Sequence, residues 1–420
     1  MTNKNNKTKL ILFWLDKLVK GKCTVKQAAE STGYNTCYMS QLKKKYIMYG
    51  PECLVHGNKD KIPHNKTPEE TINRILSIYS QPEYEGCNFK LFQESLEEDY
   101  NITVSYNTLR SIMMDAGIKS PKRHKIKVKD KTHLPRPRRA NEGDLIQLDG
   151  TPYEWFKLFG DNKKYCLHGA IDDATSKITA FYMTQNECLY GVMKLFEITA
   201  LRHGLPREAY MDRAAWACVT PRLKNCLSIT EQLSGIHEKR TQVQRAMYDL
   251  NINQVLAWSP QAKGRVERMW TTVQDRLPLW LFKHGYDTMD KFNAHIGEFI
   301  DYLNKRFSRP AASENDFWRP APEDISEILC ARFRHKTNIN GVFKFHSYQF
   351  AITECPFVAN KYFDLCVSAD GLMAQMDNGN YYPVKLLDDD LGYVIGDTMP
   401  EVVKNIIYEN LFTFAKEVSA

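Results

Sequence analysis

The chain has 420 residues and a formal net charge of +7, and this length predicts two to four domains because one domain usually holds roughly 100–200 residues. No stretch approaches the roughly 20 consecutive apolar residues of a membrane span, the start MTNKNNKTK lacks the apolar core of a signal peptide, and the 11 cysteines make no CxxC pair. We therefore expect a soluble cytoplasmic protein with reduced thiols and neither a zinc knuckle nor a disulfide framework.

Positive charge is concentrated in the first 140 residues. They contain 26 Lys and Arg against 14 Asp and Glu, a balance of 26 − 14 = +12, and the remaining residues contain 31 against 36, or −5. A basic segment predicts a polyanionic partner. An acidic remainder is typical of a cation-dependent catalytic domain or of a solvated surface.

The first predicted element is a helix-turn-helix at residues 24–46, in a domain that we place at residues 1–62. Gly33 permits the tight turn, and Ala29 four residues earlier lets the two helices cross closely. The second helix ends in three basic residues that we assign to DNA contact: Lys43, Lys44 and Lys45. A three-helix bundle without a ligand is the alternative.

A second helix-turn-helix domain, of the winged type, is expected at residues 63–120. Its last helix is predicted at 105–118, where Ser105 is the N-cap and Gly117 ends the helix, as in a recognition helix. We assign Arg110 of this helix to DNA contact. Two such units in tandem within a basic segment favour DNA binding over two helical bundles without a ligand.

Residues 121–142 form a basic linker. Nine Lys and Arg stand against one acid in residues 121–139, and three prolines discourage a continuous helix. An extended basic segment can lie along DNA phosphates and make binding salt-dependent; a solvated tether is the alternative. The linker residues that we assign to DNA contact are Lys122, Arg123, Lys125, Lys127, Arg136, Arg138 and Arg139.

From residue 143 to about 310 strands alternate with helices. Apolar or alternating runs predict five strands, at 144–150, 164–172, 177–185, 208–212 and 254–259. Apolar residues at helical spacing predict helices at 190–204 and 241–252 and a long helix that starts at Ser259 and is kinked at Pro278. This order predicts a mixed sheet with helices against its faces.

The C-terminal part has a different pattern. Short alternating runs predict a small β-barrel domain at residues 325–395, and a helical tail follows at 396–420. The expected fold class is therefore a multidomain α/β protein with an all-α tandem helix-turn-helix at the N-terminus, a central mixed α/β catalytic domain at 143–310 and a C-terminal β-barrel.

Three acidic residues are candidates for a catalytic site. Asp149 is predicted to end the first strand, Asp212 ends the fourth, and Glu267 sits on the long helix beside an apolar stripe. Functional groups gather at the carboxyl ends of adjacent strands, and a nearby helix edge can add a third. Two Mg²⁺ or Mn²⁺ ions would neutralise such acids and support in-line displacement at phosphorus. Each acid alone also fits a structural role, such as a turn, a surface ion pair or a helix pair with Lys263.

Two other aspartates compete for the same role. Asp172 and Asp173 follow a predicted strand, but they fall at the turn of a hairpin, where Asp is favoured for backbone hydrogen bonding. We therefore assign both of them to structure.

Four motifs then indicate a family: QLDGTPYEW at 147–155, AIDDATSKITAFY at 170–182, YMDR at 210–213 and SPQAKGRVERMWTTVQDRL at 259–277. Together they resemble the integrase core of bacterial insertion-sequence transposases, closest to the ISNCY group of the DDE transposase and retroviral integrase superfamily. The resemblance implies an RNase H-like fold, with Asp149, Asp212 and Glu267 as the catalytic and metal-binding residues and two Mg²⁺ or Mn²⁺ ions per active site. It also implies that Lys263, Arg265 and Arg268 lie near the DNA backbone, and that the protein associates with the bacterial nucleoid.

Two features depart from such relatives. They usually have Ser before the second Asp and His soon after it, whereas the run here is YMDRAAWACV, and the gap from second to third acid, 267 − 212 = 55, is longer than in retroviral integrases.

The leading expectation is an active transposase, an endonuclease and polynucleotidyl transferase that cleaves double-stranded DNA at the element's ends and joins them to target DNA. We expect it to act as a homodimer or higher oligomer on DNA. One alternative is an inactive or domesticated transposase that regulates by sequence-specific DNA binding. An RNase H-type ribonuclease ranks last, because it needs a fourth carboxylate in the cluster.

Overall fold

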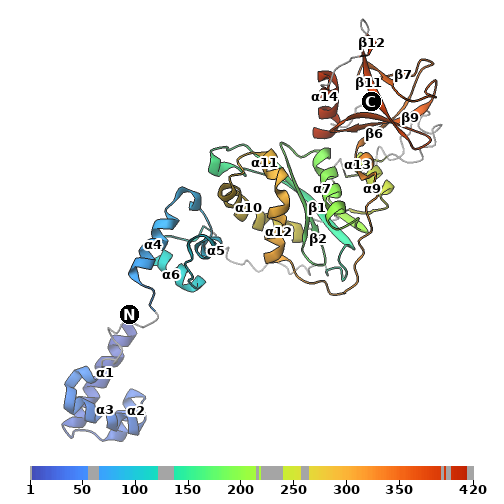
Figure 1. Cartoon of the computed structure of the whole chain (residues 1–420). Helices are drawn as coiled ribbons and strands as arrows, with labels where there is room; N and C mark the ends of the chain where they lie inside the picture. The colour runs from blue at the N-terminus through green and yellow to red at the C-terminus, as the bar shows by residue number, and fades with distance from the viewer. Residues whose placement is uncertain are drawn as a thin grey trace. The chain divides into compact units, whose positions relative to one another are not determined.

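The structure is a computed structural model that describes residues 2–54, 66–121, 137–213, 217–218, 240–256, 264–388, 392–393 and 399–413. The chain divides into two compact units, Met1–Arg74 and Ile75–Ala420. Figure 1 gives the element labels used from here on. None of the helices in the described ranges has the length and apolar character needed to cross a bilayer.

The first unit is helical. It begins with α1 (Thr2–Val19), α2 (Val25–Thr32), α3 (Thr36–Tyr49) and the 3-10 turn η1 (Gly50–Leu54). Leu15, Ala28 and Met39, one from each α-helix, are fully buried in its core. Gly33 ends α2 in the left-handed region at φ 73°, which a glycine adopts without strain.

A second group of helices follows: α4 (Glu69–Tyr79), the 3-10 turn η2 (Pro82–Tyr84), α5 (Phe89–Tyr100) and α6 (Tyr106–Asp115). Side-chain caps start the last two helices, because Asn88 accepts from the backbone N–H of Leu91 and Ser105 from that of Thr108. Phe92 is fully buried at the centre of this group, against the ring of Tyr84.

The central domain is built on a five-stranded mixed sheet in the order β3-β2-β1-β4-β5. The strands are β1 (Leu145–Tyr153), β2 (Tyr165–Asp172), β3 (Ile178–Thr184), β4 (Glu208–Met211) and β5 (Asn253–Leu256). β2 is antiparallel to β1 and β3, whereas β4 is parallel to β1 and β5. The predicted mixed α/β architecture is confirmed.

Helices cover both faces of this sheet (Figure 1). One face carries α7 (Leu189–Arg202) and α9 (Gln242–Asp249), and the other carries α10 (Gly264–His284), α11 (Met289–Ala294) and α12 (Ile296–Phe307). Side chains alternate along β1, so Ile146 and Leu148 pack on the α7 face, and Gln147 and Asp149 project to the α10 face.

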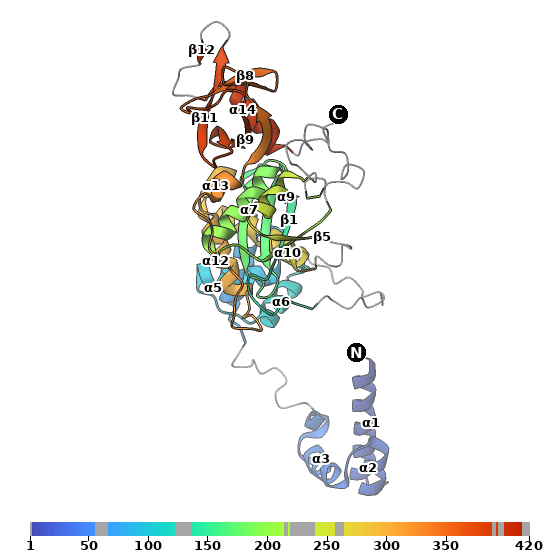
Figure 2. The ribbon, with the colours of Figure 1, turned by 90° about the vertical axis from the view of Figure 1, so that its right-hand side faces the viewer.

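The C-terminal domain is a seven-stranded antiparallel sheet. Its strands are β6 (Ala331–Lys336), β7 (Val342–Phe345), β8 (Tyr348–Ile352), β9 (Tyr362–Ser368), β10 (Gly371–Met376), β11 (Tyr381–Asp388) and β12 (Gly392–Tyr393), in the order β6-β9-β10-β11-β8-β7 with β12 on β11. α13 (Ile325–Ile328) precedes the sheet, and α14 (Glu401–Ile407) with the π-helical turn η5 (Tyr408–Phe412) follows it. The sheet is barrel-like and nearly closed, as expected (Figure 2).

One expected strand boundary is wrong. β1 does not end near residue 150 but continues to Tyr153, so Asp149 lies within the strand and not at its end. The pairing with β4 is described only as far as Gln147, but the pairing with β2 continues to Tyr153 opposite Tyr165 and keeps the backbone extended. The long helix α10 continues through Pro278 to His284, and its expected start at Ser259 lies outside the described residues.

Candidate active site

Asp149 lies under α10 and is held by that helix. The indole Nε1–H of Trp270 donates to Asp149 Oδ2 at 3.0 Å, and one turn further along Gln274 Nε2 contacts Thr151 Oγ1 at 3.3 Å. Gln147, Asp149 and Thr151 share one face of β1 because alternate residues of a strand point the same way. α10 therefore follows a polar row on β1, and an indole N–H fixes the orientation of the first candidate acid.

The first turn of α10 is anchored by a buried ion pair. Arg265 Nη1 lies 2.8 Å from Asp173 Oδ1, and these side chains are 10% and 0% exposed. Asp173 also accepts from Gln147 Nε2 at 2.7 Å and from the backbone N–H of Arg139 at 2.8 Å. Because a buried carboxylate needs such partners, Asp173 ties β1, the end of the linker and α10 together.

Asp172 has a local structural role. It is fully buried and accepts from Thr175 through the backbone N–H at 2.8 Å and the hydroxyl at 2.7 Å, and from the backbone N–H of Gly143 at 3.0 Å. Burial raises the pKa of this carboxyl, and the Thr175 hydrogen bonds oppose the shift. These contacts are those of a turn-stabilising aspartate.

Asp212 directly follows β4, next to the strand that carries Asp149. The parallel pairing joins Leu145 to Glu208 and Gln147 to Tyr210, and the same register two residues further would set Asp212 beside Asp149. Asp212 is half-buried. One candidate acid thus lies on β1, and a second directly follows the adjacent parallel strand β4.

Glu267 lies in the first turn of α10 and is exposed. Residues three apart share a helix face, so Glu267 stands one turn before Trp270, whose indole holds Asp149. Arg268 is exposed beside it, with its Nε donating to the Gly264 carbonyl at 3.0 Å. Glu267 therefore lies on the helix that holds Asp149, one turn before the residue that makes the contact.

Within the described ranges, no group of three Asp, Glu, His or Cys side chains is arranged to hold a metal ion. The three candidate acids do not form such a group among the described residues. As a donor set they suit Mg²⁺ or Mn²⁺, because these hard cations take carboxylate oxygens.

The linker arginines at the start of the central domain contact the protein itself. Arg138 Nη1 donates to the carbonyls of Asp173 and Ala174, both at 3.1 Å, and to Ser176 Oγ at 2.9 Å. Arg139 Nη2 lies 2.5 Å from Glu208 Oε2. These two arginines bind the end of the linker to the central domain. This role differs from the DNA contact that was predicted for them.

The other residues assigned to DNA divide into two sets. Lys44, Lys45 and Arg110 are exposed, and Lys43 is half-buried. The following residues lie outside the described part of the chain: Lys122, Arg123, Lys125, Lys127, Arg136 and Lys263.

On the opposite face of the sheet lies a buried histidine that no sequence pattern indicates. His168 of β2 shares a 3.0 Å hydrogen bond with Thr184 Oγ1 of β3. Burial lowers its pKa from 6.5 to about 4. Gly191 of α7 lies directly over the ring, because a Cβ there would stand 2.3 Å from His168.

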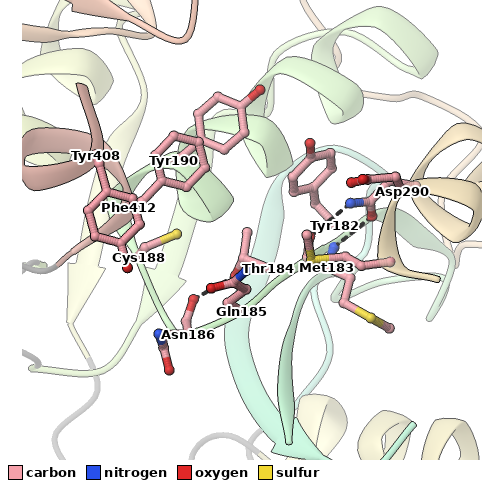
Figure 3. A pocket seen from close by; sticks show the side chains of 12 residues that line it. Tyr182, Met183, Thr184, Gln185, Asn186, Cys188, Tyr190, Asp290, Tyr408 and Phe412 are labelled. Atoms are coloured by element: carbon pink, nitrogen blue, oxygen red, sulfur yellow. Dashed lines mark hydrogen bonds between the residues drawn. The ribbon is translucent and has the colours of Figure 1, made fainter. Parts of the chain in front are cut away.

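A pocket of about 370 Å³ lies past the end of β3, between α7, α11 and η5 (Figure 3). Tyr182, Tyr190 and Phe412 line it, and the rings of Tyr190 and Phe412 are 4.7 Å apart. The Asn293 side chain closes one side by pairing with the backbone of Met183, at 2.9 and 2.8 Å. None of the three candidate acids lines this pocket, so it is separate from the candidate active site.

No family model matches the chain. Among solved structures, a dimeric HTLV-2 integrase catalytic core in complex with magnesium has a TM-score of 0.27 at 18% identity and covers 40% of this chain and 91% of its own. A chain of the simian T-cell lymphotropic virus intasome, solved with a PP2A regulatory subunit, has a TM-score of 0.30 at 13% identity and covers 73% of this chain and 95% of its own.

Two proteins are similar to the chain over most of its length. The transposase y4bF of Sinorhizobium fredii is 27% identical over 409 residues, which cover 96% of this chain and 85% of the relative. The transposase for insertion sequence IS1202 of Streptococcus pneumoniae is 29% identical over 353 residues, which cover 77% of this chain and 73% of the relative. The chain is therefore similar to two transposases over most of its length.

Proposed function

We propose that this protein is a DDE transposase with an RNase H-like catalytic domain. It binds the ends of its element, cleaves phosphodiester bonds there and joins the ends to target DNA. One observation carries the proposal: in a chain similar to transposases, Asp149 lies on β1, Asp212 directly follows the adjacent parallel strand β4, and Glu267 lies one helical turn from the Trp270 that holds Asp149.

In this proposal the three carboxylates hold two Mg²⁺ or Mn²⁺ ions. When bound, such ions neutralise the acids, supply an activated oxygen nucleophile and stabilise the leaving oxygen of an in-line displacement. Trp270 restrains Asp149 through its Oδ2. The Arg265–Asp173 ion pair keeps the first turn of α10 in place. Glu267 is exposed and can reach its neighbours by a change of rotamer.

The helical part of the chain supplies the proposed DNA contacts. α2 with α3 and α5 with α6 are taken as helix-turn-helix pairs, and the exposed Lys44, Lys45 and Arg110 face double-stranded DNA. Two ends must be processed together, so the active species is a homodimer or higher oligomer on DNA.

A charge-neutral substitution of one acid tests the catalytic proposal. Glu267→Gln keeps the size of the side chain but removes a hard anionic ligand, so we expect cleavage of a DNA fragment that spans the element's end to fall about a thousandfold or more in Mg²⁺. Binding of the same fragment, measured by gel shift, should be unchanged. Glu298→Gln, on the exposed surface of α12, is the matched control and should cleave normally.

Cleavage by Glu267→Gln at the wild-type rate would remove Glu267 from the mechanism.

A second candidate function, a DNA-binding regulator without activity, is favoured by the run YMDRAAWACV, in which the fully buried Met211 stands where relatives usually have Ser. Ala214 and Ala215 of this run lie outside the described residues. The regulator is supported if wild-type protein binds the ends specifically and nicks them in neither Mg²⁺ nor Mn²⁺.

A further inference from the structure

Helix α5 is joined to the central domain by ion pairs with α10 and α12 (Figure 2). Arg276 of α10 is the innermost of the cations. Its Nη1 donates to Glu94 Oε2 at 2.7 Å and to the Tyr302 hydroxyl at 2.9 Å, and its guanidinium stands 4.8 Å from the centre of the Phe307 ring. One guanidinium thus links α5, α10 and α12.

Two further cations extend this contact. Lys283 Nζ, near the end of α10, lies 2.5 Å from Asp99 Oδ2 and 2.8 Å from Ser95 Oγ. Arg306 of α12 pairs with Glu98. We call the six charged residues of this contact the α5 dock: Glu94, Glu98, Asp99, Arg276, Lys283 and Arg306.

The α5 dock differs from an ordinary set of surface ion pairs in its burial and geometry. The Arg276 and Glu94 side chains are 8% and 19% exposed. A buried charge that loses its partner cannot be solvated by water, so separating the pair costs free energy. Such a pair therefore fixes the arrangement of the helices that carry it. Because three cations meet three acids along one helix, the dock also sets the orientation of α5.

The dock reaches the candidate active site through one rigid element. Glu267 and Arg276 are on the same helix, and their separation of 276 − 267 = 9 residues corresponds to about 14 Å along its axis. α5 also packs on α6. The chain of contacts from α6 through α5 to α10 therefore ends at the helix that carries the third acid.

The DNA-facing side of α6 remains open in this arrangement. Tyr106 is 41% and Met114 51% exposed, and Arg110 between them is exposed as well. A contact that blocked DNA binding would be expected to cover these side chains. The open face instead fits an arrangement in which α6 can bind DNA while α5 stays docked.

We propose that the α5 dock holds α6 and its bound DNA at a set distance from Asp149 and Glu267 of the same chain, with Arg276 and Lys283 as positioning residues. This inference rests on the proposed function, because it gives α6 the DNA end and the acids the cleavage. The basic residues of α10 and α12 then form the surface on which α5, the acidic helix of the same chain, docks. Cleavage at one defined phosphodiester depends on the docking of α5, because a shift of about 1 Å between the DNA and the catalytic groups can lower the rate a hundredfold.

A charge exchange at the outer pair tests the proposal. Lys283→Glu and Asp99→Lys each place like charges in contact, and the double variant restores an opposite pair. These side chains are 26% and 37% exposed, so the variants remain compatible with folding. Lys291→Glu is the matched control, because it breaks the more exposed α11 pair with Asp287.

The readout that does not need catalysis is energy transfer between a dye on the bound DNA end and a dye introduced at the exposed Ala294 of the core. Each single variant should lower or broaden the transfer efficiency, and the double variant should restore it. End affinity should stay near wild type in all variants. Cleavage at the correct phosphodiester should fall roughly tenfold or more in the single variants and recover in the double variant.

The outcomes separate the two proposals. Unchanged energy transfer and accurate cleavage in both single variants overturn the positioning role of the dock. Failure of the double variant to recover either readout also overturns it. If wild-type protein binds ends and never cleaves, but energy transfer follows the charge exchange, the docking of α5 is supported and the proposed catalysis fails.

Discussion

His168, behind the candidate site, should make stability depend on pH. Its folded-state pKa is lowered by burial to about 4 from an ordinary 6.5. Below pH 6.5 His168 is protonated in the unfolded chain, whereas in the folded chain it stays neutral down to about pH 4. The unfolded state therefore binds more protons in this window, and the free energy of unfolding falls as the pH falls through it. The contribution should be fully present above pH 6.5 and reduced by about 3 kcal/mol near pH 4.

Urea denaturation at a series of pH values measures this dependence. Other groups titrate in the same range, so the informative quantity is the difference between wild type and His168→Gln, which keeps a hydrogen-bonding group near Thr184. The difference in unfolding free energy should be constant above pH 6.5 and shift in favour of the variant below it. A difference that does not vary with pH would show that His168 does not stay neutral in the fold.

At the scale of residues, the sequence predicted which acids to examine but not what holds them. The positions of Asp149, Asp212 and Glu267 at strands and on a helix indicate them as candidates, and the β1–β4 register, if continued by two residues, would set Asp212 beside Asp149. The role of Trp270 is not predictable, because periodicity cannot show that its indole N–H meets a carboxylate 121 residues away in sequence. The family resemblance implies a DNA contact for Arg265, but its side chain pairs with Asp173, which is adjacent only after folding.

At the scale of elements, α9 completes the edge of the C-terminal sheet. β6 is an edge strand, and Gln242 of α9 bonds both outward backbone groups of Arg332: its Nε2 donates to the carbonyl at 2.8 Å and its Oε1 accepts from the N–H at 2.9 Å. Gln242→Ala would leave both backbone groups without these partners in a half-buried place. We expect the free energy of unfolding to fall by about 1–3 kcal/mol.

Urea denaturation of the full chain measures this loss, with Gln185→Ala as the control. Gln185 is exposed, so its truncation should change stability by no more than about 0.5 kcal/mol. Equal effects of the two substitutions would mean that water replaces the Gln242 side chain at the edge of β6.

Element types were predictable where one face of an element is buried and where turns are marked. The alternation in residues 164–172 and 177–185 predicted β2 and β3 closely. The end of β1 was misplaced because Asp-Gly after an apolar run is a common turn, whereas here cross-strand pairing with β2 carries the strand to Tyr153. α1 was not predicted, because its first turns are polar and offer no start signal. Its burial of Leu15 depends on contacts with the helices that follow.

At the scale of the whole molecule, the sequence predicted the order of architectures and the division of charge. The mixed α/β domain and the barrel-like sheet follow the helical segment in the expected order. The α5 dock could not be foreseen, because the acidic residues of α5 read as a solvated helix face until α10 and α12 supply the matching cations. Three acids of the basic N-terminal segment therefore attach α5 to the core, and the exposed Lys44 and Lys45 are the residues of the proposed DNA contact.

Salt dependence of DNA binding sums the phosphate contacts of the whole chain, so it can test the part played by α3. Each lysine that neutralises a phosphate releases a counterion, and its loss should lower the slope of log affinity against log salt by about 1. Lys44 and Lys45 are exposed within α3, which does not end at these lysines as expected but continues to Tyr49. We expect the double substitution Lys44→Gln and Lys45→Gln to lower that slope by about 2 and to weaken binding similarly on all DNA sequences.

Fluorescence anisotropy from about 50 to 200 mM salt covers the range in which this term is large. Lys20→Gln is the matched control, because Lys20 lies in the same unit but its Nζ pairs with Asp16 at 2.7 Å. That variant should keep the wild-type slope. An unchanged slope in the double variant would remove Lys44 and Lys45 from the DNA contact and leave phosphate neutralisation to other basic residues of the chain. A loss of affinity confined to the element's own end would instead point to base contacts by α3, since phosphate contacts carry no sequence information.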